Sequence, residues 1–243
     1  MREETAGACA VVKICGLREP APVRAAAAAG AELIGFVFAP SKRQVAPAVA
    51  AVLIAALRQE WGAAAPRCVG LFVNEAPATI AGVVAACGLD LVQLCGDEPP
   101  GAATLVAIGV PVIRMLRPSS GDAAELAAQI AAWQAAAEAA DALAGPVRGP
   151  WGRRLLIGLD APQAGAYGGT GRLADWTLAA DLAAQQPIML AGGLTPANVA
   201  AARAAVRPWA VDVSSGVETA GRKDPALIQA FVAAAQNPTR DEF

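Results

Sequence analysis

Near the start of the chain lies the stretch Val11-Val12-Lys13-Ile14-Cys15-Gly16, an apolar run that ends in a thiol before a turn. Far downstream a second such run, Leu155-Leu156-Ile157-Gly158-Leu159-Asp160, ends in a carboxylate. Strands of a parallel barrel end around one mouth, so Cys15 and Asp160 are predicted to meet there as an acid/base pair. The chain contains no histidine, so proton transfer near neutral pH must use a tuned Cys, Asp, Glu or Lys.

Short runs rich in Val, Ile, Leu and Phe alternate with longer alanine-rich runs along the chain. The short runs predict eight strands, at residues 11–15, 33–38, 68–73, 90–94, 110–116, 154–160, 187–191 and 209–213. The longer runs predict eight helices, at about residues 20–29, 46–59, 76–87, 100–108, 122–142, 175–185, 196–206 and 224–235. Eight such pairs in 243 residues favour an α/β fold, a single closed (β/α)8 TIM barrel, over an open doubly wound sheet.

We expect one barrel domain over residues 1–243, with a short N-terminal extension at residues 1–10 and a C-terminal tail at 236–243. The Gly/Pro-rich stretch at residues 145–152 is predicted to be a long loop after an extended fifth helix, not a linker between domains. The chain is therefore expected to form a single core.

Charge and composition limit the possible partners. A formal net charge of -2 and a pI near 5.3 leave no general basic surface for nucleic acid or anionic lipid, so an anionic ligand needs a local site. The apolar run at residues 45–57 is shorter than the ~20 residues of a membrane span and contains Pro47. Five cysteines without a C-x-x-C motif, and an N-terminus unlike a signal peptide, predict a reduced, cytoplasmic protein.

Glycine-rich loops follow the last three predicted strands and indicate a phosphate site. They are Gly168-Gly169-Thr170-Gly171, Gly192-Gly193 and Ser214-Ser215-Gly216. Backbone amides at such turns form anion sites, and in barrels the loops after strands seven and eight commonly hold phosphate. Any one of these loops alone would be better explained as a tight turn, but three of them after consecutive strands favour a phosphate site. We predict that phosphate is bound by Gly169, Gly192, Gly193, Ser214, Ser215 and Gly216.

Seven segments together resemble the phosphoribosylanthranilate isomerase family of tryptophan biosynthesis. In chain order they are Val12-Lys13-Ile14-Cys15-Gly16, Gly35-Phe36-Val37-Phe38 with Ser41-Lys42-Arg43, Val69-Gly70-Leu71-Phe72-Val73-Asn74, Val92-Gln93-Leu94-Cys95-Gly96-Asp97-Glu98, Leu159-Asp160-Ala161 with Gly168-Gly169-Thr170-Gly171, Ala191-Gly192-Gly193-Leu194, and Val211-Asp212-Val213-Ser214-Ser215-Gly216-Val217-Glu218. The first and last segments are the most specific, and the matches extend from the first strand to the last helix.

The resemblance implies an Amadori rearrangement of N-(5-phosphoribosyl)anthranilate to 1-(2-carboxyphenylamino)-1-deoxyribulose 5-phosphate, with no cofactor and no metal. It implies that Asp160 is the acid that opens the furanose ring and that Cys15 is the base that takes the C2′ proton. Arg43 matches the position expected to bind the anthranilate carboxylate, although a loop arginine beside Lys42 is also explained as solvated charge. The expected partner is a small phosphorylated substrate, and the protein is expected to be a monomer or homodimer.

Three further polar residues are predicted to bind substrate or to order the catalytic pair: Lys13, Gln93 and Asp212. Lys13 is two residues from Cys15 on one strand, so both point to the same face. It is either the cation that favours the thiolate or an interior lysine that pairs with a carboxylate such as Asp212. The fourth-strand motif departs from the family pattern, because Cys95 stands where the family usually has a histidine.

Three alternatives remain open at the level of sequence. An epimerase barrel would use the same phosphate site, but such enzymes normally need metal-binding histidines. A dual-substrate isomerase shared with histidine synthesis would have paired aspartates where this chain has Cys15. A catalytically silent phosphate-binding barrel would not need both Cys15 and Asp160.

Overall fold

The structure is a computed structural model of the chain, and it describes residues 10–118, 123–147, 152–161 and 175–236. The predicted N-terminal extension up to residue 9, the tail from residue 237 and the phosphate-site prediction at Gly169 lie outside the described residues.

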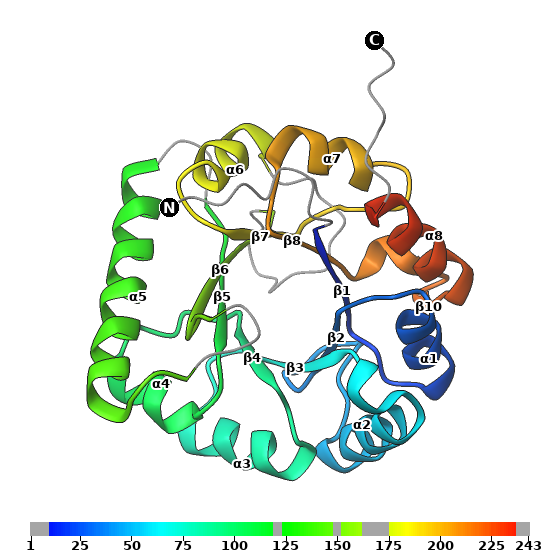
Figure 1. The fold of residues 1–243 in the computed structure, drawn as a ribbon, viewed down its shortest axis with the longest axis horizontal. Coiled ribbons are helices and arrows are strands. Elements are labelled where there is room, and N and C mark those ends of the chain that lie inside the picture. Colours follow the sequence, from blue (N-terminus) through cyan, green and yellow to red (C-terminus); the bar gives the residue numbers. More distant parts are fainter. Residues whose placement is uncertain (1–9, 119–122, 148–151, 162–174, 237–243) are drawn as a thin grey trace.

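Eight parallel strands close into one barrel in chain order, β1 next to β2 and onward until β8 pairs with β1 (Figure 1). The strands are β1 Val11–Cys15, β2 Leu33–Val37, β3 Arg67–Phe72, β4 Leu91–Leu94, β5 Val112–Leu116, β6 Leu155–Leu159, β7 Ile188–Leu190 and β8 Ala210–Val213. The predicted closed (β/α)8 barrel is confirmed, and each predicted strand overlaps an observed one.

A ring of helices surrounds the barrel (Figure 1). The helices are α1 Pro20–Ala28, α2 Pro47–Trp61, α3 Pro77–Cys87, α4 Ala102–Ile108, α5 Ala123–Ala144, α6 Trp176–Ala183, α7 Val199–Val206 and α8 Pro225–Gln236. Four of them begin at a proline, whose fixed φ suits the first helical turn and whose missing N–H would have had no partner there. Pro47 therefore starts the helix in the apolar run 45–57 instead of interrupting it.

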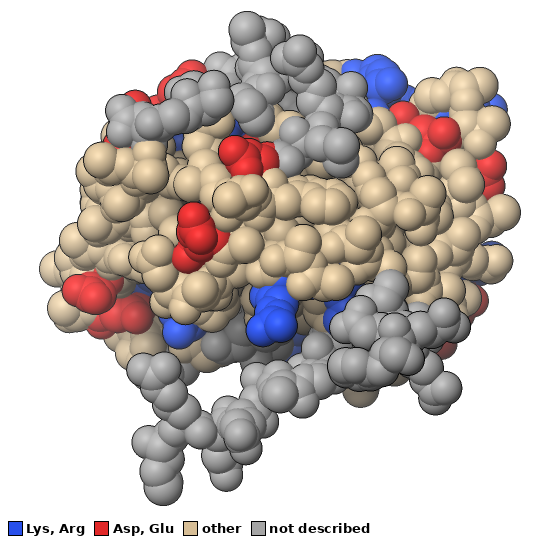
Figure 2. All heavy atoms as spheres, turned by 90° about the horizontal axis from the view of Figure 1, so that it is seen from above, with Lys and Arg blue, Asp and Glu red and all other residues tan. Residues whose placement is uncertain are grey.

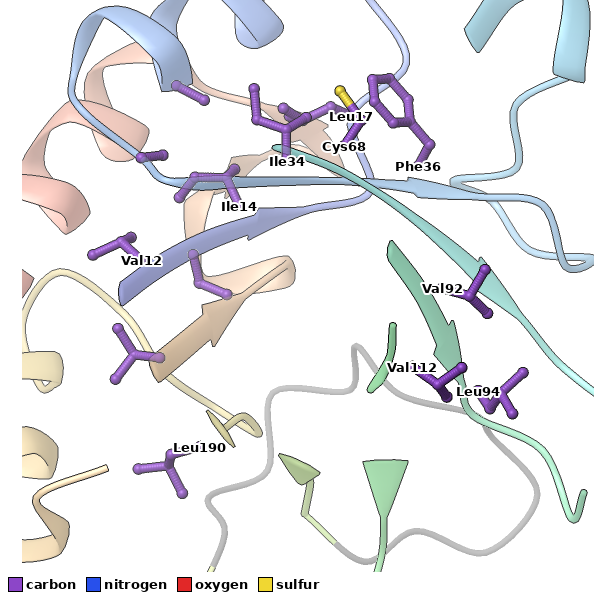
Figure 3. Packing of buried hydrophobic residues seen from close by; sticks show 14 of the residues in the cluster. Val12, Ile14, Leu17, Ile34, Phe36, Cys68, Val92, Leu94, Val112 and Leu190 are labelled. Carbon is purple, nitrogen blue, oxygen red and sulfur yellow. The ribbon is translucent and has the colours of Figure 1, made fainter. Parts of the chain in front are cut away.

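Residues of each strand alternate between the helix layer and the barrel interior. In β1, Val12 and Ile14 pack outward with Phe36 and Leu94 in the apolar layer beneath the helices (Figure 3). Lys13 and Cys15 point the other way, into the barrel, as the period of a strand requires. The sequence Val-Lys-Ile-Cys thus directs two polar groups toward the interior while the strand remains anchored by its apolar side chains.

Two features beyond strand 8 were not predicted. A short 3-10 helix, η2 Ser215–Val217, leads into an antiparallel pair, β9 Glu218–Thr219 and β10 Arg222–Lys223. This β9–β10 hairpin lies between β8 and α8. It brings Glu218 and Lys223 back to the mouth of the barrel.

Helix α7 begins at Val199, three residues later than predicted. The side chain of Asn198 accepts a hydrogen bond from the Thr195 N–H (2.7 Å) and donates one to the Gly193 carbonyl (3.0 Å). These bonds close a turn ahead of the helix, so the helix starts only after Asn198.

The outer wall shows no concentration of one charge on the side seen in Figure 2, where basic and acidic side chains are set apart among uncharged ones. This agrees with the expectation that an anion must be held by a local site. Within the described part of the chain, no helix is both long and apolar enough to cross a membrane.

Candidate active site

A cavity of about 620 Å³ opens at the carboxyl ends of the barrel strands. It is lined by predicted site residues and by apolar neighbours: Cys15, Val37, Ala39, Pro40, Ser41, Lys42, Arg43, Leu71, Val73, Asn74, Gln93, Cys95, Met115, Asp160, Asp212 and Ser214. The walls therefore combine an apolar surface, which suits an aromatic ring, with a small number of polar groups.

Cys15 and Asp160 both face this cavity, as predicted. Cys15 is the last residue of β1 and is buried, whereas Asp160 directly follows β6 and is half-buried. Burial raises the pKa of Asp160, and the nearby Asp212 carboxylate adds to this, although the hydrogen bond from the Ala161 N–H (2.8 Å) opposes it. A raised pKa favours the protonated form that an acid needs.

Lys13 lies in the barrel interior beside Cys15 and does not line the cavity. Its Nζ is 2.9 Å from Oδ1 of Asp212, directly opposite on β8. Burial would lower the pKa of Lys13, but the charges of Asp212 and of the Cys15 thiolate outweigh it and raise the pKa. Lys13 thus contacts both Asp212 and Cys15, the two partners that the sequence left as alternatives, and it stays charged.

The thiol of Cys15 has room because its neighbour on β2 is a glycine. Gly35 pairs with Cys15, and a Cβ at Gly35 would come within 2.9 Å of the thiol sulfur and 3.2 Å of Lys13 Nζ. A side chain there would displace both groups. The glycine of the Gly35-Phe36-Val37-Phe38 segment is therefore explained by close packing around the thiol.

The environments of the two groups predict how activity depends on pH. Burial raises the pKa of Cys15 above its ordinary 9.0, although Lys13 lowers it, and the pKa of Asp160 is raised from 3.8. In the predicted roles, the active form of the protein needs a protonated Asp160 and an ionised Cys15. If Asp160 keeps the lower pKa of the two, this form is a small fraction of the protein, and the fraction is constant between the two pKa values. We expect kcat/KM to be flat through neutrality and to fall on both sides, with the alkaline limb above pH 9. An alkaline limb near pH 7 would contradict this reading.

Arg43 reaches the cavity across the end of β1. A Cβ at Gly16 would come within 2.6 Å of Arg43 Cδ, so a side chain there would force Arg43 to shift from this path. The guanidinium is paired with Glu218 of the β9–β10 hairpin through Nε to Oε1 (2.5 Å) and Nη2 to Oε2 (3.0 Å). If Arg43 binds the substrate carboxylate as predicted, it must do so while it is paired with the carboxylate of Glu218.

Gln93 is buried in β4 and lines the cavity. Its Nε2 donates to the Cys95 sulfur (3.2 Å), while its Oε1 has no hydrogen-bond partner among the described residues. A buried acceptor without a partner is costly, so a donor from a bound ligand would stabilise it. Burial raises the pKa of Cys95 to about 12, against the hydrogen bond from Gln93, so Cys95 is a neutral thiol.

A second, smaller hollow of about 40 Å³ adjoins the cavity and contains the remaining predicted phosphate residues, Gly192, Gly193, Ser214, Ser215 and Gly216, together with Asp160 and Asp212. The backbone N–H groups of Gly193, Ser215 and Gly216 donate to no acceptor among the described residues. Unpaired amides in the lining of one hollow suit an anion.

Sequence reasoning missed the role of the β9–β10 hairpin. Glu218 entered the sequence analysis only as the last residue of a family segment, yet its carboxylate pairs with Lys223 Nζ at 3.0 Å at the barrel mouth. Lys223 also donates to the Ser214 carbonyl (2.7 Å), and Ser214 Oγ donates to the Cys15 carbonyl (3.2 Å). The sequence pattern offers no signal for these pairings.

The fold is a (β/α)8 barrel, and the comparisons with known proteins place the chain among barrel isomerases. The family model described as "N-(5'phosphoribosyl)anthranilate (PRA) isomerase" matches residues 12–234. The chain belongs to the N-(5'-phosphoribosyl)anthranilate isomerase family.

Individual relatives agree with this. The N-(5'-phosphoribosyl)anthranilate isomerase of Roseiflexus sp. (strain RS-1) is 45% identical over 231 residues, covering 93% of this chain and 97% of that protein. The phosphoribosyl anthranilate isomerase structure from Thermotoga maritima has a TM-score of 0.70 at 32% identity, covering 93% and 98%. Another such isomerase, solved with reduced 1-(o-carboxyphenylamino)-1-deoxyribulose 5-phosphate, has a TM-score of 0.68 at 31% identity, with the same coverage.

Proposed function

We propose that the chain isomerises N-(5'-phosphoribosyl)anthranilate to 1-(2-carboxyphenylamino)-1-deoxyribulose 5-phosphate, the third step of tryptophan biosynthesis. The observation that supports it most directly is that a member of this family has Cys15 and Asp160 facing one cavity. The assay is addition of the purified protein to phosphoribosylanthranilate, with loss of the anthranilate-like fluorescence as the readout. No loss of fluorescence with folded protein would refute the proposal.

Asp160 is the proposed acid in the first step. Protonated Asp160 donates to the furanose ring oxygen while the bond from that oxygen to C1′ breaks, and the anilino nitrogen supplies the electron pair that forms the C1′–N double bond. The raised pKa of Asp160 favours its protonated form, and a phosphate dianion in the adjoining hollow would raise it further.

Cys15 is the proposed base in the second step. Its thiolate takes the C2′ proton, and the electron pair of that C–H bond moves toward the iminium to give an enolamine. Return of a proton to C1′ and loss of the C2′ hydroxyl proton then give the ketone. The thiolate is needed before the proton moves, so the charge of Lys13 assists the step.

The hollow lined by Gly193, Ser215 and Gly216 is proposed to hold the substrate phosphate. Inorganic phosphate should then compete with substrate, raising KM without lowering kcat, because backbone amides bind any tetrahedral anion of this size. Initial rates against phosphate at constant ionic strength, with chloride as the matched salt, check this. Equal inhibition by chloride would indicate general screening instead of a site.

Arg43 is proposed to bind the anthranilate carboxylate. Arg43→Lys keeps the charge but loses the planar guanidinium, so we expect affinity to fall by roughly 1.5 to 3 kcal/mol, the value of a charge-assisted hydrogen bond. An aniline analogue that lacks the carboxylate should bind parent and variant about equally. If the analogue loses as much affinity as the substrate, Arg43 acts through structure or general charge.

We also propose that the protein works in the cytoplasm as a monomer or homodimer. The four cysteines within the described residues are free thiols, in keeping with a reducing compartment. One similar structure is described as that of monomers of a dimeric isomerase from Thermotoga maritima. Light scattering of the purified chain distinguishes one subunit from two.

A further inference from the structure

Glu218 connects two loops at the barrel mouth. Its carboxylate forms ion pairs with Arg43 and Lys42 from the loop after β2, the latter at 3.6 Å, and with Lys223 from β10. The side chain of Glu218 is only 5% exposed. Burial would raise its pKa, but the hydrogen bonds from Arg43 and Lys223 outweigh it and lower the pKa to about 2, so Glu218 stays ionised at working pH.

The pairing uses only one edge of the Arg43 guanidinium. Guanidinium has two edges that can bind a carboxylate, one formed by Nε with Nη2 and one formed by Nη1 with Nη2. Glu218 takes the first edge. Nη1 makes no hydrogen bond to a described residue, and Nη2 keeps a second proton, so the other edge is available on a residue that lines the cavity.

We propose that Glu218 is a positioning residue that fixes Arg43 by one edge of its guanidinium and presents the other edge to the substrate carboxylate. The inference rests on the proposed function, because it assumes a substrate with a carboxylate. Gly16 adds to the same effect, because a Cβ at this position would come within 2.6 Å of Arg43 Cδ and displace the side chain. Specificity for the aromatic half of the substrate would then depend on the hairpin as well as on Arg43.

The charges in the cluster allow an anion to approach. Glu218 carries one negative charge, while Lys42, Arg43 and Lys223 carry three positive charges, so the group remains cationic with its internal pairs formed. An ordered arginine also loses less side-chain entropy when it binds. The opposing possibility is that Glu218 merely occupies Arg43 until substrate displaces it, in which case removing Glu218 would improve binding.

The test compares Glu218→Gln with the parent on two substrates, phosphoribosylanthranilate and its aniline analogue without the carboxylate. We expect KM for the carboxylated substrate to rise about fivefold, as for loss of one preordered side chain, with kcat within about twofold. KM for the analogue should change far less, because Glu218 contacts none of the backbone amides that are proposed to hold the phosphate. A fall in KM for the carboxylated substrate, no change in it, or an equal change for both substrates would overturn the proposal.

Two further variants separate positioning from loss of fold. Glu218→Asp keeps the charge but shortens the reach, so it should change the ratio of the two KM values in the same direction and by less. Glu98→Gln removes another ion pair, that of Glu98 with Arg114, which is also largely buried at the carboxyl ends of the strands. It should lower stability comparably and leave the ratio of KM values as in the parent.

The result also distinguishes this proposal from the one on which it rests. If the parent does not turn over phosphoribosylanthranilate, the proposed function fails. If the parent is active and prefers the carboxylated substrate, but Glu218→Gln and Glu218→Asp keep that preference, only the positioning role of Glu218 fails.

Discussion

Replacement of Cys15 by serine is expected to lower kcat by at least ~10²-fold, the usual contribution of a general base. The substitution keeps the size of the side chain at a buried position, so the barrel should stay folded. A serine hydroxyl has too high a pKa to ionise beside Lys13, so the base is lost while the cavity remains. Steady-state kinetics should show KM changed far less than kcat.

Asp160→Asn is the companion experiment and should have a similar effect, because an amide cannot protonate the ring oxygen. Cys95→Ser is the matched control, since Cys95 is another buried thiol of the same cavity. It should cost far less than Cys15→Ser. Should a folded Cys15→Ser or Asp160→Asn protein turn over substrate near the parent rate, the assignment of the catalytic pair is wrong.

Lys13→Met is expected to cost about 3–5 kcal/mol of unfolding free energy, because it leaves the carboxylate of Asp212 buried without its partner. The pair is well shielded, with Lys13 fully buried and the Asp212 side chain 9% exposed. Urea denaturation followed by circular dichroism measures the loss. Activity should fall as well, since the thiolate of Cys15 loses its neighbouring cation.

The double variant Lys13→Met/Asp212→Leu separates these two effects. Apolar groups of similar volume can replace a buried ion pair without loss of stability, so much of the unfolding free energy should return. Turnover should not return, because neither substitution restores a positive charge near Cys15. Recovery of activity together with stability would mean that the ion pair serves the fold alone.

Most of the barrel could be predicted because its signals are local. Strand β1, for example, is bounded by the same residues in the prediction and in the structure. Apolar strands and alanine-rich helices differ in composition, and a barrel of this type places the ends of its strands at one mouth. Cys15 and Asp160 could therefore be assigned to a common cavity before any coordinates were known.

The missed features depend on contacts between distant residues. Arg43 and Glu218 are 175 positions apart, and nothing in the spacing of either residue predicts that they pair. The late start of α7 has a local cause instead, because the Asn198 side chain bonds to Thr195 and Gly193, three and five positions away, and closes a turn before the helix. Patterns along the chain indicate which elements form, whereas side-chain pairing depends on how the closed barrel places them.

The pair of Lys13 and Asp212 lies on the seam where β1 meets β8, and 199 positions of chain separate its members. During synthesis Lys13 therefore emerges well before Asp212, the carboxylate that neutralises it. A barrel that lacked β8 would have to bury the Lys13 ammonium without a partner, which is costly. Closure of the barrel and formation of the ion pair beside the Cys15 thiol therefore occur together. A fragment that ends before β8 should remain open and inactive.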